Sequence, residues 1–428
     1  MDTLAIMGDS LTSGTEYEAA RTIWNGAVTS RPLAVLRCAT VADVQAGIRS
    51  AQDKGIALSV RGGGHDWAGR ALADGGLTLD LSPMRQVSVD PATAVATVAG
   101  GATAADAAAA AQRAGLVAVT GTAGSVGMAG LTLGGGYGPL SGRFGLAADN
   151  LLSADVVLAD GTLVTADEEH DPELLWALRG GGGNFGVVTT MRIQLHAVPA
   201  ILAGMIMFPF DVLPELEESL LRSPDELTVQ AGFVTAPTGE PVLFAAPTWC
   251  GDPETGSKVL RRLTELGEPL AAQVGPTTMT EQLAQIDAMF PAGRHVEIGS
   301  RTVTALDRTV QEVLLDAARA RTSPLSAISL HSLHGAAARV PADATAFRNR
   351  TPHLMVETIA VWEPGDPAED QHRAWVRGTD RLPGGYPNLL GPGDVERTAA
   401  VFGPNADRLR AAKKRYDPDL VFHAPGRL

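Results

Sequence analysis

The chain has 428 residues and a mass of 44.4 kDa, and its hydrophobic (45%) and charged (19%) fractions are those of a soluble globular protein. This length exceeds what one ordinary core supports, so two domains are expected. The net charge of −14, from 34 basic and 48 acidic side chains, argues against nucleic acid as a partner, because phosphate-binding surfaces are rich in Lys and Arg.

Cys38 and Cys250 are the two cysteines, and they lie far apart in the sequence. Two such residues form neither a disulfide framework nor a zinc-binding spacing, so two buried thiols are expected. The N-terminus lacks a basic segment followed by a long apolar run, and no stretch is apolar enough to span a bilayer. We therefore expect a cytoplasmic protein without a membrane partner.

The first half of the chain mixes helices and strands without a regular alternation. Thr103 can cap an alanine-rich helix, Asp160-Gly161 is typical of a hairpin turn, and Pro172 suits the first turn of a helix. Taken in chain order, the expected elements are a helix at 41–53, strands at 56–60, 77–81 and 94–98, a helix at 104–114, a hairpin of 151–158 with 162–165, a helix from Pro172 to Gly180, and a strand at 186–195.

The second half predicts a sheet with helices on one face. Expected strands are 201–209, 227–235, 242–249 and 354–362, and expected helices are 254–266, 280–288, 304–321 and 404–416. Residues 326–330 also have the character of a strand. The fold class that accommodates both halves is α+β.

The 48 glycines are concentrated before residue 190. They cluster at 62–64, 100–101, 134–138 and 180–186, and such clusters indicate tight backbone geometry or close approach to a ligand. The second half is richer in proline. We therefore expect a ligand-binding N-terminal domain that ends near Pro199.

Two of these clusters have the character of ligand-binding loops. Gly62, Gly63 and Gly64 follow an expected strand and precede His65, so successive backbone N–H groups can converge on an anion such as a pyrophosphate. A tight turn would need one glycine or two. The second cluster, 134–138, follows a run of small residues at 120–133 that is expected to lie flat against a large ligand.

A third glycine pattern is misleading. Gly181, Gly183 and Gly186 have the spacing of the dinucleotide-binding fingerprint. That fingerprint must follow a strand and open a helix, whereas this one follows a helix and opens a strand. A Rossmann site for NAD is therefore rejected.

Taken together, these loops resemble the berberine bridge enzyme branch of the vanillyl-alcohol oxidase flavoproteins. The similarity extends over nearly the whole chain. The shared residues include Trp24-Asn25-Gly26, Arg31-Pro32, Arg61 to His65, Ala68-Gly69, Gly100-Gly101, Gly134 to Gly138, Asp149-Asn150, Asp160-Gly161, Gly180 to Gly182, Asn184 to Gly186, Tyr386, Asn388 and Tyr416-Asp417-Pro418.

The resemblance implies a PCMH-type FAD-binding domain of two subdomains at 1–198, a substrate domain at 199–384 and a segment at 385–428 that returns to the FAD domain. It also implies FAD bonded covalently to His65. The residues that match the family's FAD-binding positions are Arg61, Gly62, Gly63, Gly64, His65, Ala68, Gly69, Thr122, Ser125, Val126, Gly127, Gly130, Gly134, Gly135, Tyr137, Gly138, Asp149, Gly186, Val187 and Val188.

Three departures from the family pattern affect the predicted chemistry. Many members attach the flavin a second time through a cysteine, whose position is Ala123 here, so a single covalent link is predicted. The family's terminal tyrosine base is replaced by Leu389, which can only pack. The usual Asn-Gln after Val-Phe is also missing, and His423 stands there instead.

Glu357 is the predicted general base. It lies in the apolar strand 354–362, where a carboxylate is costly to bury unless it is paired, protonated or functional. In the family this strand faces the flavin. The alternative is that Glu357 points outward or pairs with an arginine. Tyr386 and Asn388 are predicted near the reactive edge of the flavin, and Tyr137 is expected to pack beside the cofactor.

His331 and His334 form the second set of candidate side chains. One of them could point into the site. Their spacing alone does not make a metal site, because no third ligand is indicated.

The implied reaction is hydride transfer from a small organic substrate to the flavin, followed by reoxidation by molecular oxygen. A dehydrogenase or a redox-neutral cyclase on the same scaffold is the alternative. A secondary metabolite, an amine and a carbohydrate all remain compatible as substrates. A remote alternative is a serine hydrolase, because Gly8-Asp9-Ser10-Leu11 resembles the nucleophile block of the Gly-Asp-Ser-Leu hydrolases; that block explains none of the glycine clusters.

Overall fold

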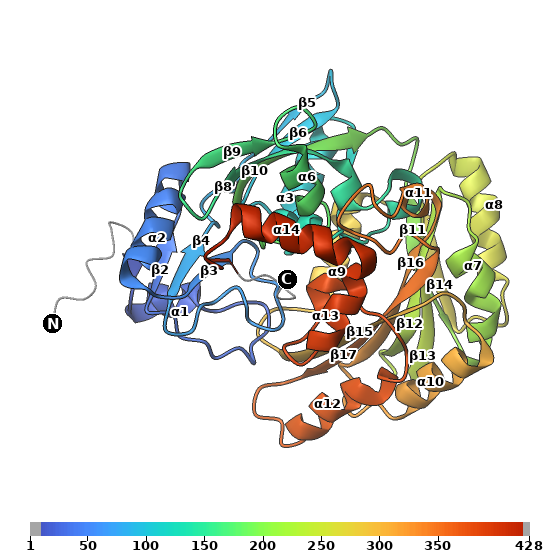
Figure 1. Cartoon of the computed structure of the whole chain (residues 1–428). Coiled ribbons are helices and arrows are strands. Elements are labelled where there is room, and N and C mark those ends of the chain that lie inside the picture. Colours follow the sequence, from blue (N-terminus) through green and yellow to red (C-terminus); the bar gives the residue numbers. More distant parts are fainter. Residues whose placement is uncertain (1–9, 423–428) are drawn as a thin grey trace.

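The structure is a computed structural model in which residues 10–422 are described. Its first sheet has four strands in the order β1–β2–β4–β3, formed by Ser10–Leu11, Ala34–Arg37, Leu77–Asp80 and Leu58–Arg61 (Figure 1). Strands β2, β4 and β3 are parallel. Helix α1 (Gly14–Ala20) contacts β1 and β2, and α2 (Val41–Lys54) contacts β2 and β4.

Helix α2 begins and ends where the sequence predicts. The Thr40 side chain accepts a hydrogen bond from the Asp43 N–H, and the Asp43 carboxylate accepts one from the Thr40 N–H, which is a capping box. Gly55 ends the helix with φ of 61°, in the left-handed region that glycine adopts without strain.

The second sheet has six strands, β5 (Val87–Asp90), β6 (Val95–Ala99), β10 (Val187–His196), β8 (Leu151–Val157) and β9 (Leu163–Ala166) in that order, with β7 (Val117–Ala118) also paired to β10. The helices of this region are α3 (Ala104–Arg113), α4 (Met128–Leu133), α5 (Ser141–Phe144), η1 (Ala147–Asn150) and α6 (Pro172–Leu178). Alanines of α3 join the buried core of this sheet, so the small residues permit close helix–sheet packing.

The third sheet has seven antiparallel strands, β14 (Ala271–Pro276), β11 (Leu202–Phe208), β13 (Pro241–Trp249), β12 (Leu227–Thr235), β16 (Ala327–Leu333), β17 (His353–Trp362) and β15 (His295–Val303) in that order. One face packs in a single apolar core with helices η2 (Phe210–Leu216), α7 (Glu217–Leu221), α8 (Pro253–Thr264), α10 (Arg308–Arg319), α12 (Glu369–Trp375) and η3 (Val376–Thr379). The other face turns toward the first half of the chain (Figure 1).

Both faces of the central strand β16 are therefore covered. All seven residues of β16 are buried, because one face packs on helices and the other on Tyr137, Phe347 and Tyr386. Helix α9 (Met279–Met289) departs from the other helices and packs against α3 of the first half. The short α11 (Gly335–Arg339) contacts α5.

The last segment contacts the first half of the chain. It contains η4 (Pro387–Leu389), α13 (Val395–Phe402), η5 (Gly403–Asn405) and α14 (Ala406–Tyr416), and α14 lies next to α6 (Figure 1). The buried Lys413 ammonium donates to the backbone carbonyls of Asn184 (2.7 Å) and Phe422 (2.6 Å) and pairs with Asp417. The residue boundaries 198/199 and 384/385 stay predictions.

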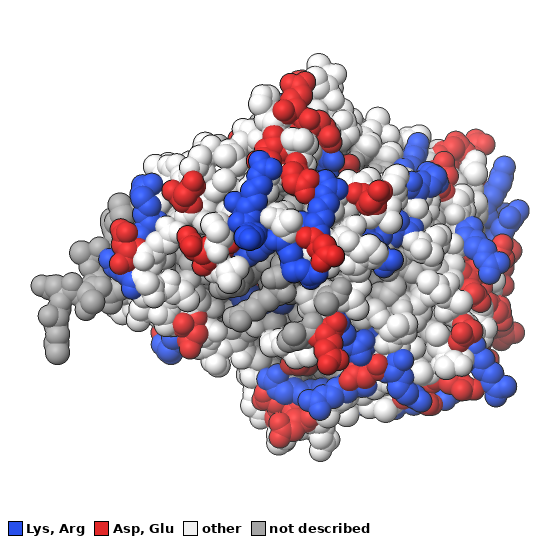
Figure 2. Space-filling view, in the orientation of Figure 1, with Lys and Arg blue, Asp and Glu red and all other residues white. Residues whose placement is uncertain are grey.

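Acidic and basic side chains are interspersed on the face shown in Figure 2, with no broad basic area among the described residues there. Within residues 10–422, no helix is long and apolar enough to cross a bilayer.

Candidate active site

The loop Gly62–His65 leaves β3 with its backbone donors unused. Within the described part of the chain, the N–H groups of these four residues make no hydrogen bond. A Cβ atom on Gly63 would lie 2.2 Å from the Gly127 nitrogen, so this loop and the 125–127 loop touch backbone to backbone. Converging free N–H groups suit an anionic group such as the pyrophosphate of FAD.

Arg61 and the turn after His65 flank this loop in sequence, and both make ion pairs or hydrogen bonds within the protein. The Arg61 guanidinium donates to the Ala20 carbonyl (2.5 Å) and lies 3.8 Å from Asp80, so its charge is directed into the protein. Asp66 binds Arg70 through both carboxylate oxygens (2.7 and 2.8 Å). Ala68 and Gly69 lie in this turn, and Gly69 has φ of 83°.

His65 itself is held on two sides. Its Nε2 lies 2.9 Å from Ser125 Oγ, and the Trp24 ring stacks on the imidazole with a centroid distance of 5.2 Å and an interplanar angle of 19°. Burial lowers the pKa of His65 to about 4. The imidazole is therefore neutral at pH 7, the state in which a ring nitrogen can act as a nucleophile.

At several of the 134–138 glycines, other protein atoms occupy the space that a side chain would need. A Cβ on Gly134 would meet the Asn388 amide at 2.1 Å, one on Gly135 would meet Phe347 at 2.8 Å, and one on Gly138 would meet the Thr120 carbonyl at 1.7 Å. Gly130 has open space around it. Thr122 and Val126 lie half-buried in the loop that carries Ser125. Contact of these positions with the cofactor stays a prediction.

Other predicted cofactor residues serve packing in this structure. Asp149 forms a buried bidentate ion pair with Arg350 (2.7 and 2.8 Å). Gly186 stands against Val156 and Val157, and the two residues after it, Val187 and Val188, begin β10. None of these contacts includes the His65 loop, so a role of these four residues in holding FAD stays a prediction.

Both thiols lie in apolar cores. Cys38 is buried in the core of the first sheet, and Cys250 is buried in the cluster between α3 and α9. Burial raises the pKa of Cys38 to about 12 and that of Cys250 to about 11, so both stay protonated at neutral pH. Ala123 occupies the position of the family's second attachment residue.

Glu357 lies on the face of the seven-stranded sheet that turns toward the first half. Its Cα neighbours are Ser300 on β15 and Ser329 on β16, and its side chain is 15% exposed. Its partner is a histidine rather than an arginine: Glu357 Oε2 lies 3.2 Å from His331 Nε2.

His331 joins Glu357 to further polar groups. Its Nε2 also lies 3.0 Å from Ser329 Oγ and 3.4 Å from the Gln230 amide nitrogen. His331, Glu357, Ser329 and Gln230 form a polar row across β12, β16 and β17. We call the pair within it the Glu357–His331 dyad. The row gives the site a carboxylate and an imidazole that can exchange a proton.

Tyr386 connects this row to the glycine loop. Its hydroxyl accepts a hydrogen bond from the Gly136 N–H (2.9 Å), and its own N–H donates to Ser300 Oγ (3.0 Å). Burial raises the pKa of Tyr386 above its usual range, so it stays a neutral phenol. Asn388 donates to the Gly130 carbonyl at 3.1 Å. Leu389 packs beside Trp67, whose indole N–H donates to the Leu389 carbonyl at 3.2 Å.

Tyr137 has a partner that the sequence did not indicate. Its hydroxyl lies 2.6 Å from His353 Nε2, and His353 Nδ1 lies 2.6 Å from the Thr351 carbonyl. The carbonyl can only accept, so Nδ1 carries the ring proton and Nε2 accepts from Tyr137. Burial lowers the pKa of His353 to about 4.

The two spaced histidines separate in the fold. His331 contacts Glu357, whereas His334 is buried beside Ser332 and near Gly142. Among the described residues, no group of three potential metal ligands is present.

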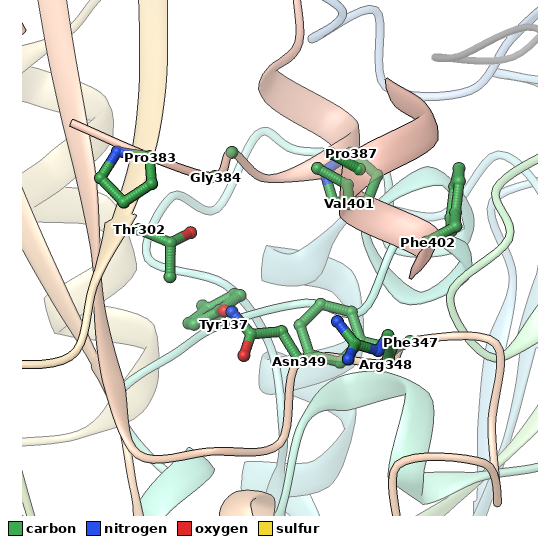
Figure 3. Close-up of a pocket in the computed structure, with 12 residues that line it drawn as sticks. Tyr137, Thr302, Phe347, Arg348, Asn349, Pro383, Gly384, Pro387, Val401 and Phe402 are labelled. Atoms are coloured by element: carbon green, nitrogen blue, oxygen red, sulfur yellow. The ribbon is translucent and has the colours of Figure 1, made fainter. Parts of the chain in front are cut away.

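A pocket of about 210 Å³ lies beside the Tyr386–Asn388 turn (Figure 3). Tyr137, Phe347 and Asn349 line one side, and Pro387 and Phe402 line the other. It extends from Tyr137 toward helix α13.

Comparison with known proteins identifies the family. Residues 32–167 match the family described as FAD binding domain, and residues 371–426 match the one described as berberine and berberine like. The FAD-linked oxidoreductase aurO of Gibberella zeae is 34% identical, over 96% of this chain and 83% of that protein. The chain belongs to the berberine-like family of FAD-linked oxidoreductases.

One further curated relative of this berberine-like oxidoreductase and two solved structures are oxidases by name. (R)-6-hydroxynicotine oxidase of Paenarthrobacter nicotinovorans is 31% identical over 95% of this chain and 93% of that protein. A crystal structure of 6-hydroxy-D-nicotine oxidase from Arthrobacter nicotinovorans has a TM-score of 0.88, with 28% identity, 98% of this chain and 97% of that one covered. Xylooligosaccharide oxidase from Myceliophthora thermophila has a TM-score of 0.82, with 27% identity and 97% and 95% coverage.

Family membership confirms the predicted fold class and the predicted FAD-dependent oxidoreductase activity, and it removes the hydrolase alternative. Ser10 lies in β1, paired with Leu36 of β2, whereas Gly8, Asp9 and His423 lie outside the described residues. The residues that sequence reasoning missed are Gln230, Asp287 and His353. They had no local signal, because only the folded chain brings them to the site.

Proposed function

We propose that this berberine-like oxidoreductase carries FAD on a single covalent bond to His65 and oxidises a small organic substrate, with molecular oxygen as the electron acceptor. Bound FAD would supply the hydride acceptor. The observation that carries the proposal is the arrangement of a neutral His65 between two glycine loops, with the Glu357–His331 dyad on the sheet face that turns toward them.

In this proposal the chain's own residues place and deprotonate the substrate. Glu357 removes a proton from the substrate heteroatom next to the C–H bond that is broken, and His331, in contact at 3.2 Å, receives that proton. Tyr386 links the glycine loop to the sheet through its hydrogen bonds with Gly136 and Ser300. A neutral Tyr386 positions groups and does not act as the base.

The first experiment measures the intact mass of the denatured protein, together with in-gel flavin fluorescence after acid treatment. Wild type is expected to exceed its sequence mass by one FAD, and His65→Ala is expected to lose that increment while binding FAD reversibly. Ala123→Cys is the complementary variant for the single link, because it restores a cysteine at the family's second attachment position. A wild-type protein at its bare sequence mass would overturn the covalent anchor.

Oxygen as acceptor is tested by stopped-flow reoxidation of the substrate-reduced protein. An oxidase is expected to return to the oxidised spectrum rapidly in air-saturated buffer and to release hydrogen peroxide in equal amount. Slow reoxidation by oxygen with rapid reoxidation by an artificial dye would instead establish a dehydrogenase. Both the nicotine and the sugar oxidases among the relatives supply substrate panels for the reductive step.

A further inference from the structure

A chain of three side chains connects helix α9 to the predicted flavin anchor. Asp287 on α9 accepts a hydrogen bond from Ser125 Oγ at 2.6 Å, and Ser125 Oγ lies 2.9 Å from His65 Nε2. The Ser125 backbone N–H also donates to Asp287 (3.2 Å). This second bond holds the exposed serine turn against the carboxylate.

The single proton of a hydroxyl fixes the direction of this chain. An ionised carboxylate can only accept, so the Ser125 proton points to Asp287. Ser125 Oγ is then left with lone pairs toward His65, and the hydrogen bond requires that Nε2 carries the ring proton. In a neutral imidazole the other nitrogen, Nδ1, must hold a free lone pair.

The surroundings of His65 agree with this tautomer. Nδ1 has no hydrogen bond among residues 10–422. The stacked Trp24 ring holds the plane of the imidazole, and burial keeps the imidazole neutral. The ring therefore presents Nδ1 in one orientation and one protonation state.

We propose that Asp287 and Ser125 are positioning residues that select the Nε2–H tautomer of His65 and so make Nδ1 the nucleophile that bonds to the flavin. The proposal rests on the covalent anchor proposed above. His65 Nδ1 forms a bond to the 8α carbon of the flavin, one C–H bond of that carbon breaks, and its proton leaves. The two electrons reduce the isoalloxazine, and dioxygen takes them to form hydrogen peroxide.

The source of Asp287 adds a second requirement. Asp287 belongs to the part of the chain that builds the seven-stranded sheet, whereas His65 and Ser125 belong to the first half. The segment that ends α9 also makes two hydrogen bonds with Trp24. The Trp24 indole N–H donates to the Phe290 carbonyl (3.0 Å), and the Trp24 carbonyl accepts from the Gly293 N–H (3.0 Å). Covalent attachment therefore requires α9 to be seated on the first half.

The test follows attachment itself. FAD-free protein is prepared, mixed with FAD in air, and denatured at intervals, and the fraction carrying one FAD is read from the intact mass. Total FAD binding is measured separately by flavin fluorescence quenching. At saturating FAD, Ser125→Ala and Asp287→Ala are expected to attach it at least tenfold more slowly than wild type, whereas Ser125→Thr, which keeps the hydroxyl, is expected to retain the wild-type rate.

Thr280→Val is the matched control. It removes another hydrogen bond from α9 to the first half, the 2.6 Å bond to Gln112, without touching the His65 chain, and it is expected to attach FAD normally. Ser125→Ala and Asp287→Ala attaching FAD at the wild-type rate would overturn the tautomer proposal while the His65 anchor stands. A wild-type protein that never gains the FAD mass would instead overturn the anchor.

Discussion

At the scale of single residues, the proposed site contains two neutral histidines, His65 and His353, and one carboxylate, Glu357. Glu357 tolerates its position because His331 lies against it and Ser329 and Ser300 flank its strand position. The sequence predicted Glu357 because a carboxylate interrupts an apolar strand. It did not predict His331 as the partner, since that pairing depends on the register between β16 and β17, and a shift of one residue would reverse the faces.

Glu357→Gln is expected to slow anaerobic reduction of the flavin by substrate about 100-fold or more, because positioned general bases contribute about 10²–10⁴ to rate. The measurement is single-turnover stopped-flow absorbance. Glu297→Gln is the control: Glu297 lies on the neighbouring strand β15, on the opposite face, and pairs with Arg373 (2.8 Å). Reduction of the Glu357→Gln protein at the wild-type rate would show that another group is the base.

His353 predicts a pH dependence of stability. Its folded pKa is about 4 and its ordinary value is 6.5, so the unfolded chain binds the proton first as pH falls. Its contribution is complete above pH 6.5 and is lost between pH 6.5 and 4, with about 2 kcal/mol gone at pH 5. Urea unfolding at pH 7 and pH 5 measures it. His353→Gln, whose side chain does not titrate, is expected to lose correspondingly less stability over that interval; an unchanged loss would contradict the assignment.

At the scale of elements, the predicted helices and strands of the first half are confirmed because their ends carry local signals. Thr40 and Thr103 form capping boxes, and Pro172 opens α6. Strands β14 and β15 were not predicted: Glu297, Ser300 and Arg301 give β15 no apolar alternation, and its place comes from pairing with β17. The helix expected from residue 304 begins at Arg308, because the Asp307 side chain caps it.

At the glycine loop 134–138, the sequence could not distinguish contact with a ligand from contact with other segments of the chain. Small residues there were expected to lie against a large ligand, yet part of the missing bulk is occupied by Asn388, Phe347 and Thr120. A sequence pattern reports that space is needed. It does not report whether a cofactor or another segment of the chain fills that space.

Gly134→Ala is therefore expected to destabilise the protein by about 1–3 kcal/mol, the usual cost of overpacking, because the new methyl group would overlap the Asn388 amide. Thermal unfolding of the FAD-free protein is the measurement. Gly275→Ala, on strand β14 with nothing within 4 Å of the added Cβ, is the control and should change stability little. Equal effects of the two changes would mean that the Asn388 turn moves away from the new methyl group at little cost in stability.

At the scale of the whole molecule, segments distant in sequence are joined by a few buried polar contacts. Lys413 is 5% exposed and Asp417 is fully buried. Asp417 also accepts from the N–H groups of Val421 and Phe422, both at 2.8 Å. This cluster secures α14 to the Asn184 loop of the first half.

Lys413→Met is expected to cost about 3–5 kcal/mol, because it leaves the Asp417 carboxylate buried without its cation. Denaturant unfolding measures the loss. Lys414→Met is the control, since the adjacent Lys414 is exposed. A loss no larger than that of the control would show that backbone donors alone satisfy Asp417.

The position of Asp287 in the chain has a consequence for synthesis of the protein. His65 leaves the ribosome early, but Asp287 follows 222 residues later (287 − 65), which takes about 10–45 s at about 5–20 residues per second. Under the proposed His65 anchor, a nascent chain that has exposed its glycine loops would not yet orient this histidine. Covalent loading with flavin would then be delayed until most of the chain has been translated, and truncated products would not be loaded.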